Sequence, residues 1–233
     1  MRWEILLEQL FGIAHTVCAN ADFLSGMADF DGQRLAIFGT TDHSPIGVAL
    51  ALRQARFVLD TMHAYPASPV LILVDTQGQQ LRRGDELVGI NRAMAHLGCC
   101  LDLARRRGHR LIGLVYDQAL SGGFISSGLM ADDCYALPDA EIRVMGIPAM
   151  ARITKLSEQH LADLSRVNPV FAPGVANYVA MGGVRGVWQG DMRDCLREAM
   201  ARTSTIDERA HDGATRGGRT LAERVVKQVL AAT

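Results

Sequence analysis

The sequence has few aromatic side chains and no excess of either charge. Phe, Trp and Tyr make up 6% of the 233 residues, and 24 basic side chains are balanced by 25 acidic ones, for a formal net charge of -1. Nucleic-acid-binding proteins need a cationic surface to neutralise phosphates, and single-strand binders add aromatic platforms for base stacking. The composition therefore argues against nucleic acid as a partner.

Paired cysteines and long apolar runs are also missing. The five cysteines are odd in number and lack CxxC spacing, which fits buried thiols in a reducing compartment better than a disulfide framework. Glu4, Glu8 and His15 interrupt the N-terminal apolar stretch, so it does not read as a signal peptide. No run approaches the ~20 apolar residues of a membrane span. We expect a soluble, cytoplasmic protein with no membrane contact.

Several catalytic signatures are absent. The chain has no GxGxxG after its first strand, no GxxxxGK[ST] and no HExxH, which argues against dinucleotide, P-loop and zinc-protease chemistry. Ser121, Ser126 and Ser127 lack the GxSxG setting of a serine nucleophile. No spacing of ligand-type residues predicts a metal site.

The apolar residues that are present, 48% of the chain, predict an α/β protein. Val70 to Val74 and Leu111 to Tyr116 are uninterrupted apolar runs, typical of strands buried on both faces. Further strands are expected over residues 34–38, 133–137, 142–145 and 184–188. Helical periodicity predicts helices over residues 3–11, 46–63, 85–107, 157–167, 173–181, 191–202 and 221–230. The order of these elements suggests repeated strand, strand, helix units.

We expect a single domain over residues 1–233. Its core would cover about 30–190 and a helical tail 191–233. Residues 203–220 are polar and rich in Gly and Arg, which predicts a weakly ordered loop.

The stretch from Leu111 to Met130 is the one most suggestive of a site, because an apolar strand runs into Ser121-Gly122-Gly123 and an apolar helix follows. The first amides of a helix lack internal acceptors and lie at the positive end of its dipole. Glycine also lets a ligand approach the backbone closely. Such a turn can hold an anion or an oxyanion. Equally, two glycines can merely let a helix pack tightly on a strand.

Two carboxylates follow the two buried strands. Asp75 and Asp117 stand where a parallel sheet presents its strand ends, a usual place for ligands. They can act as acid or base groups, or they can be solvated turn carboxylates, and the sequence leaves both readings open.

Motifs between residues 70 and 150 resemble the carboxyltransferase halves of the crotonase superfamily in order and spacing. They are Val74-Asp75-Thr76-Gln77-Gly78, Gly84-Asp85-Glu86-Leu87-Val88-Gly89-Ile90, Leu120-Ser121-Gly122-Gly123-Phe124, Leu137-Pro138-Asp139-Ala140-Glu141-Ile142 and Val144-Met145-Gly146. The chain length and helical tail are most similar to the gamma subunits of biotin-independent malonate decarboxylases.

This resemblance implies a crotonase/ClpP-like core of ββα units with a helical C-terminal extension. It implies a complex with a related beta subunit, an acyl-carrier-protein subunit and an acyl-carrier transferase subunit. The reaction would convert malonyl-S-carrier to acetyl-S-carrier and CO2, without biotin or metal. No cofactor would bind this chain directly, because the substrate rides on the phosphopantetheine-type, dephospho-CoA-derived group of the carrier protein.

By the same resemblance, the amides of Gly122 and Gly123 would bind the malonyl carboxylate or the departing CO2. Gln77, Gly78, Ser121 and Phe124 would flank the substrate, and the beta subunit would hold the enolate oxygen. Gln77 replaces a proline usual in the larger carboxyltransferases. Two alternatives remain: a carboxyltransferase subunit of a biotin-dependent enzyme, and a non-catalytic scaffold.

Overall fold

The computed structural model describes residues 1–167, 174–202 and 206–232. Between residues 33 and 136, strands and helices alternate as in an α/β fold. The strands are β1 (Cys18–Asn20), β2 (Phe23–Phe30), β3 (Gln33–Thr40), β4 (Val70–Thr76), β5 (Leu111–Leu120), β6 (Asp133–Ala136), β7 (Glu141–Arg143) and β8 (Gly186–Val187).

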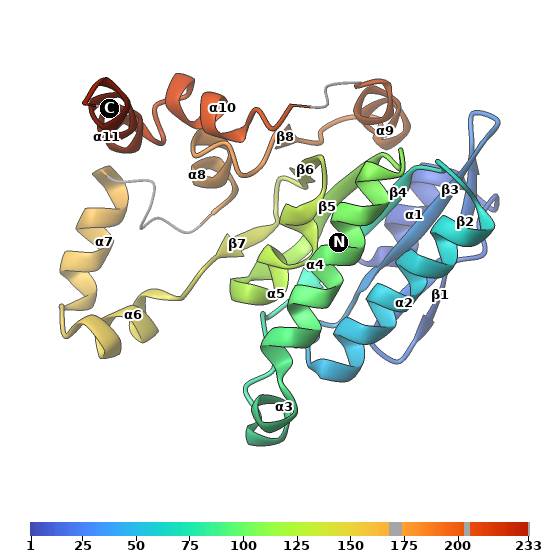
Figure 1. The fold of residues 1–233 in the computed structure, drawn as a ribbon, viewed down its shortest axis with the longest axis horizontal. Helices are drawn as coiled ribbons and strands as arrows, with labels where there is room; N and C mark the ends of the chain where they lie inside the picture. Colours follow the sequence, from blue (N-terminus) through green and yellow to red (C-terminus); the bar gives the residue numbers. More distant parts are fainter. Residues whose placement is uncertain (168–173, 203–205, 233) are drawn as a thin grey trace.

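The helices cover the sheet and extend beyond it (Figure 1). They are α1 (Trp3–Phe11), α2 (Val48–Ala64), α3 (Arg83–Val88), α4 (Ile90–Arg106), α5 (Ser121–Ile125), the 3-10 turn η1 (Gly128–Met130), α6 (Ile147–Thr154), α7 (Glu158–Val167), α8 (Val175–Ala180), α9 (Met192–Ala201), α10 (Arg209–Thr215) and α11 (Thr220–Ala231).

The eight strands form one sheet in the order β1-β2-β3-β4-β5-β6-β8, with β7 paired to β5. β1, β2 and β3 are antiparallel, whereas β3 to β6, β7 and β8 pair in parallel. The mostly parallel sheet confirms the predicted α/β class. β2, β3 and α2 make one ββα unit, whereas β5 is followed directly by α5.

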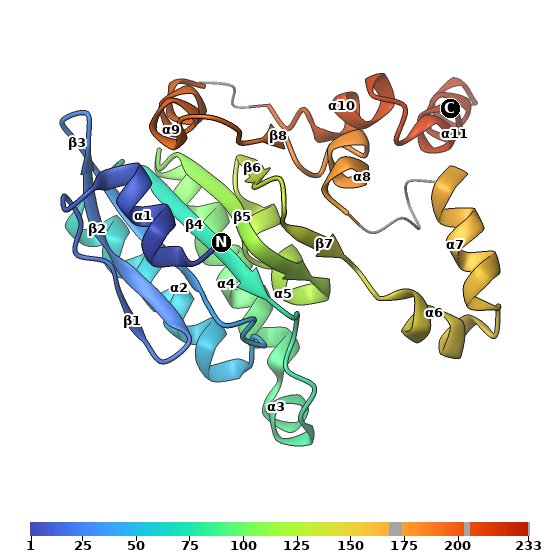
Figure 2. The same ribbon diagram turned by 180° about the vertical axis from the view of Figure 1, so that it is seen from behind.

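Helices cover both faces of the sheet, which is why β4 is buried along its whole length. α2 and α4 lie on one face, where Ile72 and Val74 enter the larger apolar cluster. α1 lies on the other, where Leu71 and Leu73 join a second cluster with α9 (Figure 2). Alternate side chains of a strand point to opposite faces, so each residue of β4 can be assigned to one of these two layers.

Several predicted boundaries were wrong. The helix expected over 85–107 is two helices, α3 and α4, because Gly89 adopts a left-handed φ of +88° between them. The helix expected from residue 46 begins at Val48, and Gly47 is its N-cap. The loop expected over 203–220 contains helix α10. Residues 203–205 and Pro173, which was expected in a helix, lie outside the described residues.

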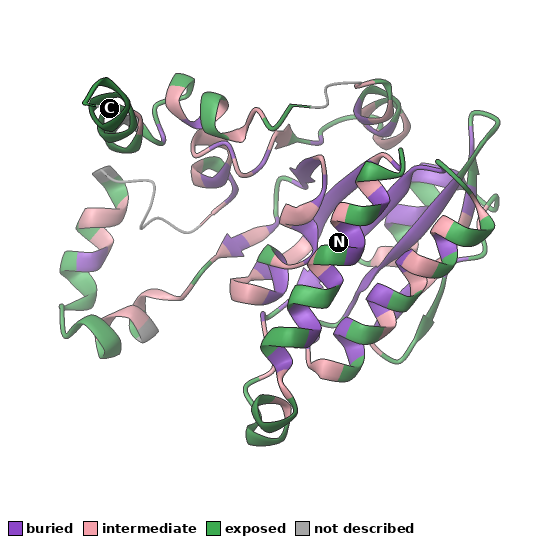
Figure 3. Ribbon diagram, in the orientation of Figure 1, coloured by how far each residue is buried: buried purple, intermediate pink, exposed green. Residues whose placement is uncertain are grey.

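The outer helices α6, α7 and α11 lie beyond the sheet, on the side of β7 away from α2 (Figures 1 and 2). Figure 3 shows them mostly exposed or half-buried, in contrast to the buried strands. α11 carries a set of apolar side chains that are more than half exposed: Leu221, Val225, Val226, Val229 and Leu230. No helix in the described ranges combines the length and the apolar composition needed to cross a bilayer.

Candidate functional site at the carboxyl edge of the sheet

The carboxyl ends of β3, β4 and β5 meet at one edge of the sheet, as parallel pairing requires. The loop after β3, the loop after β4 and helix α5 therefore lie together there. Ligands of open α/β sheets bind at such edges. The residues singled out from the sequence fall in these segments.

Helix α5 starts at Ser121, directly after β5, without an intervening turn. Ser121 itself makes the change of direction, with a left-handed φ of +49°. Gly122 and Gly123 thus occupy the first turn of the helix, where backbone amides lack intrahelical acceptors. The predicted strand-to-helix transition is confirmed, whereas anion binding by the two amides stays a prediction.

The two glycines differ in what surrounds their Cα atoms. A Cβ on Gly123 would lie 2.9 Å from the carbonyl carbon of Gly78, a backbone atom that cannot yield easily. A Cβ on Gly122 would lie 2.8 Å from Oε1 of Gln79, the far end of a flexible side chain. Gly123 is therefore needed for packing, whereas Gly122 is not.

Gly78 belongs to a loop that hydrogen bonds tie to the segment after β3. Its φ of +104° favours glycine, and its carbonyl accepts from the Ile46 amide at 2.8 Å. The buried Thr76 hydroxyl donates to the Ser44 carbonyl at 2.6 Å and accepts from the Gly78 amide at 3.1 Å. Gln77 is exposed, and its amide donates to the His43 carbonyl at 3.2 Å.

The side chains of Ser121 and Phe124 are engaged within the chain. The Ser121 hydroxyl donates to the Val144 carbonyl. The Phe124 ring is 1% exposed and lies 6.2 Å from the Tyr178 ring, centroid to centroid. Either residue could therefore contact a substrate only through its backbone or after its side chain has moved. Their assignment as substrate-binding residues stays a prediction.

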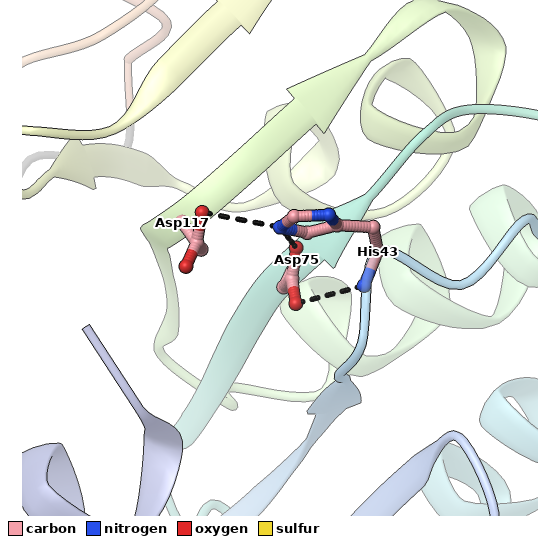
Figure 4. Close-up of side chains that lie close together, drawn as sticks. All are labelled: His43, Asp75 and Asp117. Atoms are coloured by element: carbon pink, nitrogen blue, oxygen red, sulfur yellow. Dashed lines mark hydrogen bonds and ion pairs between the residues drawn. The ribbon is translucent and has the colours of Figure 1, made fainter.

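The structure also brings together three side chains that the sequence did not connect, His43, Asp75 and Asp117 (Figure 4). His43 Nε2 lies 3.3 Å from Asp117 Oδ1 and 3.5 Å from Asp75 Oδ1. Asp117 stands at an irregularity of β5, where the register with β4 shifts between Val74 and Thr76. His43 was missed from the sequence because the loop after β3 comes to lie beside β4 and β5 only in the folded sheet. The one signal in the sequence was the Asp42-His43 pair, which follows the strand closely.

Asp75 is the buried member of this cluster, with its side chain 5% exposed. Burial raises the pKa of its carboxyl group, and the charge of Asp117 adds to the rise, while hydrogen bonding from the His43 amide opposes it. The two oxygens accept from the amides of His43 at 3.0 Å and Gln118 at 3.3 Å. Asp75 is therefore fixed in orientation by the backbone.

A pocket of about 900 Å³ opens beside this cluster, on the α1 face of the sheet. Trp3 of α1 lines it together with Tyr116 and the cluster itself. Asp75 neighbours Val74 in β4, so its side chain points away from α2 and α4 and toward α1. In contrast, Gly122 lies close to Met94 of α4. The edge thus carries two separate polar regions, one on each face.

The chain matches a malonate decarboxylase family and is similar to a carboxyltransferase. Residues 41–233 match the family model described as malonate decarboxylase gamma subunit. The malonyl-S-ACP:biotin-protein carboxyltransferase MADD of Malonomonas rubra is 30% identical over 174 residues, which are 68% of this chain and 60% of that protein. The chain thus spans less than two thirds of that relative's length.

Solved structures with the same fold include two from Pseudomonas. A chain of the malonate decarboxylase hetero-tetramer in complex with coenzyme A superposes with a TM-score of 0.79 at 24% identity, covering 95% of this chain and 97% of that one. A chain of the MdcD-MdcE hetero-dimer gives 0.76 at 25% identity, covering 97% and 96%. Transcarboxylase 12S gives 0.70 at 20%, covering 87% and 42%. These likenesses confirm the predicted crotonase-like carboxyltransferase fold.

Proposed function

Because the chain belongs to the malonate decarboxylase gamma subunit family, we propose that it forms a shared active site with a related beta subunit. The complex would convert malonyl-S-acyl carrier protein to acetyl-S-acyl carrier protein and CO2. The thioester would ride on the carrier's dephospho-CoA-derived arm, so this chain needs no cofactor of its own. The coenzyme A bound to the Pseudomonas hetero-tetramer, a related thiol carrier, is consistent with such an arm.

The reaction needs no nucleophile from the protein. When the bond between the carboxylate carbon and the α-carbon breaks, its electron pair moves into the thioester carbonyl and CO2 leaves. The enolate is then protonated at the α-carbon. Catalysis therefore consists of holding the carboxylate out of the carbonyl plane, excluding water and stabilising the enolate oxygen.

In this proposal the amides of Gly122 and Gly123 hold the carboxylate, and the beta subunit supplies the donors for the enolate oxygen. The observation that carries it is the position of both glycines in the first turn of α5, at the carboxyl edge of the sheet. A preorganised backbone donor in such a site is typically worth ~3 to 4 kcal/mol. Gln77 and Gly78, in the loop packed against this turn, would border the substrate.

The exposed apolar face of α11 supports the proposal of a partner. Monomeric proteins rarely leave a contiguous apolar face open to water, and Val225, Val229 and Leu230 are each more than half exposed. A relative at 25% identity comes from the MdcD-MdcE hetero-dimer. The beta subunit is the proposed occupant, and the carrier-protein and transferase subunits would join the same complex.

Replacement of Gly122 by valine tests the role of the amides. Gly122→Val keeps the backbone N–H but places a branched side chain beside it, which should block the approach of the carboxylate. CO2 release by the reconstituted complex should fall at least about 100-fold, comparable to the loss of one oxyanion-type donor, while subunit assembly survives. Gly98→Ala is the matched control, because its Cβ would meet only the Met130 methyl at 3.7 Å. Unchanged turnover of Gly122→Val in an assembled complex would refute this role.

Activity of the separated subunits tests the shared site. This chain, the beta subunit and their mixture should be assayed for CO2 release from a malonyl thioester. Activity confined to the mixture is the expected result. Full activity of the beta subunit alone would reduce this chain to a scaffold.

A biotin-dependent carboxyltransferase is the second candidate, favoured by the similarity to the Malonomonas rubra protein. It would use the same two amides to present a carboxyl group to biotin instead of releasing CO2. Turnover in the presence of avidin separates the two. Inhibition by avidin would favour the biotin-dependent reaction, whereas the proposed decarboxylation is insensitive to it.

A further inference from the structure

The cluster of His43, Asp75 and Asp117 has the composition and spacing of a metal site. We propose that these three residues bind a divalent transition-metal ion, with Zn²⁺ and Mn²⁺ as the candidates. Each offers one ligand atom, and the three atoms lie within 4.8 Å of one another. They come from three segments, the loop after β3, the end of β4 and the irregular part of β5 (Figure 4).

The separations suit coordination. Zn–N and Zn–O bonds of about 2.1 Å put the ligands of a tetrahedral ion about 3.4 Å apart. His43 Nε2 is 3.5 Å from Asp75 Oδ1 and 3.3 Å from Asp117 Oδ1. The side chains of His43 and Asp117 are 52% and 41% exposed, so both can adjust to close around an ion.

Asp75 is the preorganised ligand. The backbone amides of His43 and Gln118 donate to its two oxygens, and each carboxylate oxygen keeps a further lone pair for a metal. Hydrogen bonds behind a ligand fix its orientation and raise metal affinity. The same hydrogen bond from His43 draws the backbone that carries the imidazole toward Asp75.

The local charge also favours a cation. Asp42, Asp75 and Asp117 all line the adjoining pocket. Of the nearby cations, Arg2 pairs with Glu4 at 2.7 Å, and the Met1 ammonium lies 3.5 Å from Asp117 Oδ2, the oxygen other than the one facing His43. A divalent ion between the carboxylates would offset their mutual repulsion.

The donor set selects the class of ion. One imidazole and two carboxylates suit Zn²⁺ and Mn²⁺, whereas Mg²⁺ and Ca²⁺ prefer oxygen ligands alone. Three protein ligands leave a coordination position open toward the pocket. The site lies on the face of the sheet opposite Gly122, so the metal proposal can be tested independently of the proposed decarboxylation. It differs from the expectation drawn from the sequence, which was that no metal is bound.

Metal titration of the full-length, tag-free chain after chelator treatment tests the proposal. Zn²⁺ binding is measured by calorimetry, and Mn²⁺ binding by the loss of the free-ion paramagnetic resonance signal. We expect one ion per chain with a Kd near or below about 1 μM, roughly -8 kcal/mol. His43→Gln and Asp117→Asn should each weaken binding about 10-fold or more.

Asp42→Asn is the matched control, because it removes a carboxylate from the same pocket without touching the three ligands. It should leave the Kd within about twofold of the unmodified chain, since only diffuse attraction is lost. The proposal is overturned if the unmodified chain shows no stoichiometric binding. It is equally overturned if Asp117→Asn binds as tightly as the unmodified chain, or if Asp42→Asn weakens binding as much as Asp117→Asn does.

Discussion

Gly122 and Gly123 are adjacent, yet the surroundings that favour glycine differ between the two positions. At Gly123 the constraint is steric, because the Gly78 backbone lies where a Cβ would be. At Gly122 only the end of the Gln79 side chain must move. A loss of activity on changing Gly123 would therefore mix folding with chemistry, whereas a loss on changing Gly122 reports on the chemistry.

Alanine substitutions should separate the two residues by stability. Gly123→Ala overpacks against backbone and should cost about 1–3 kcal/mol, which for a chain of this size lowers Tm by about 2–4 °C per kcal/mol. Gly122→Ala should change stability by less than about 0.5 kcal/mol. Thermal unfolding of both variants, monitored by circular dichroism, gives the comparison. Equal Tm values would show that the Gly78 loop yields freely.

His43 shows why part of the site could not be predicted from sequence. Asp42 and His43 adopt consecutive left-handed conformations, with φ of +57° and +51°. Asp and His adopt this conformation more often than most residues with a Cβ, but it still costs roughly 1–2 kcal/mol each, so the sequence does not predict two in succession. This conformation is maintained by a hydrogen bond from the His43 amide to Asp75, 32 residues away in the chain. By contrast, Gly122 and Gly123 could be located because the strand and helix around them are local patterns.

Asp133 joins the C-terminal segment to the sheet. From β6 its carboxylate accepts from Arg110, from Arg185 at 2.9 Å and from Arg202 at 3.1 Å. Burial alone would raise the pKa of Asp133, but hydrogen bonds from Arg110 and Arg185 outweigh it and lower the pKa below its ordinary value. The ionised carboxylate is therefore the form that the fold stabilises.

Asp133→Asn should destabilise the chain at neutral pH by about 3–5 kcal/mol, because three arginines lose their shared buried partner. Asp133 is more acidic in the folded state, so its stabilisation is present above the ordinary pKa of about 3.9 and is lost as pH falls through the lowered value. The Tm difference between the variant and the unmodified chain should therefore be large at pH 7 and shrink below about pH 4.

The matched control is Asp163→Asn, which removes an exposed partner of Arg166 on α7. Exposed ion pairs contribute about 0–1 kcal/mol, so this variant should unfold near the temperature of the unmodified chain. A Tm difference for Asp133→Asn that stays constant from pH 7 to pH 3 would contradict the assignment of its charge.

Element prediction succeeded where burial creates an unbroken pattern. The central strands β4 and β5 were located by their apolar runs, although β5 continues four residues beyond the expected end at Tyr116. β1 was missed because all three of its residues are exposed and carry no apolar signal. The break at Gly89 was missed because the apolar stripe continues through it, and a single glycine in such a pattern is compatible with one helix.

The carboxyl edge of the sheet carries one polar region on each face of the molecule's central sheet. Val74 and Asp75 are neighbours in β4, yet one enters the α2 and α4 layer and the other points toward α1. Gly122 and the cluster of His43, Asp75 and Asp117 are thus separated by the sheet itself. Changes in the His43 cluster should leave the Gly-Gly region intact, and the two proposals can be tested in the same protein without interference.

Helix α11 exposes several apolar side chains in the chain alone. Val225 and Val229 lie one turn apart on α11, 52% and 58% exposed. Replacing both by glutamate should abolish co-purification with the beta subunit, because burying two unpaired charges costs several kcal/mol.

The unpartnered chain should keep its Tm within about 1 °C, because surface substitutions change stability by less than about 0.5 kcal/mol. Gln228→Glu is the control, since it adds a charge to the same helix at a polar position and should leave association unchanged. If the Val225→Glu, Val229→Glu double variant still binds the beta subunit, the interface does not involve α11. The exposed apolar face would then require a different occupant, and the carrier-protein and transferase subunits of the proposed complex would be the next to test against it.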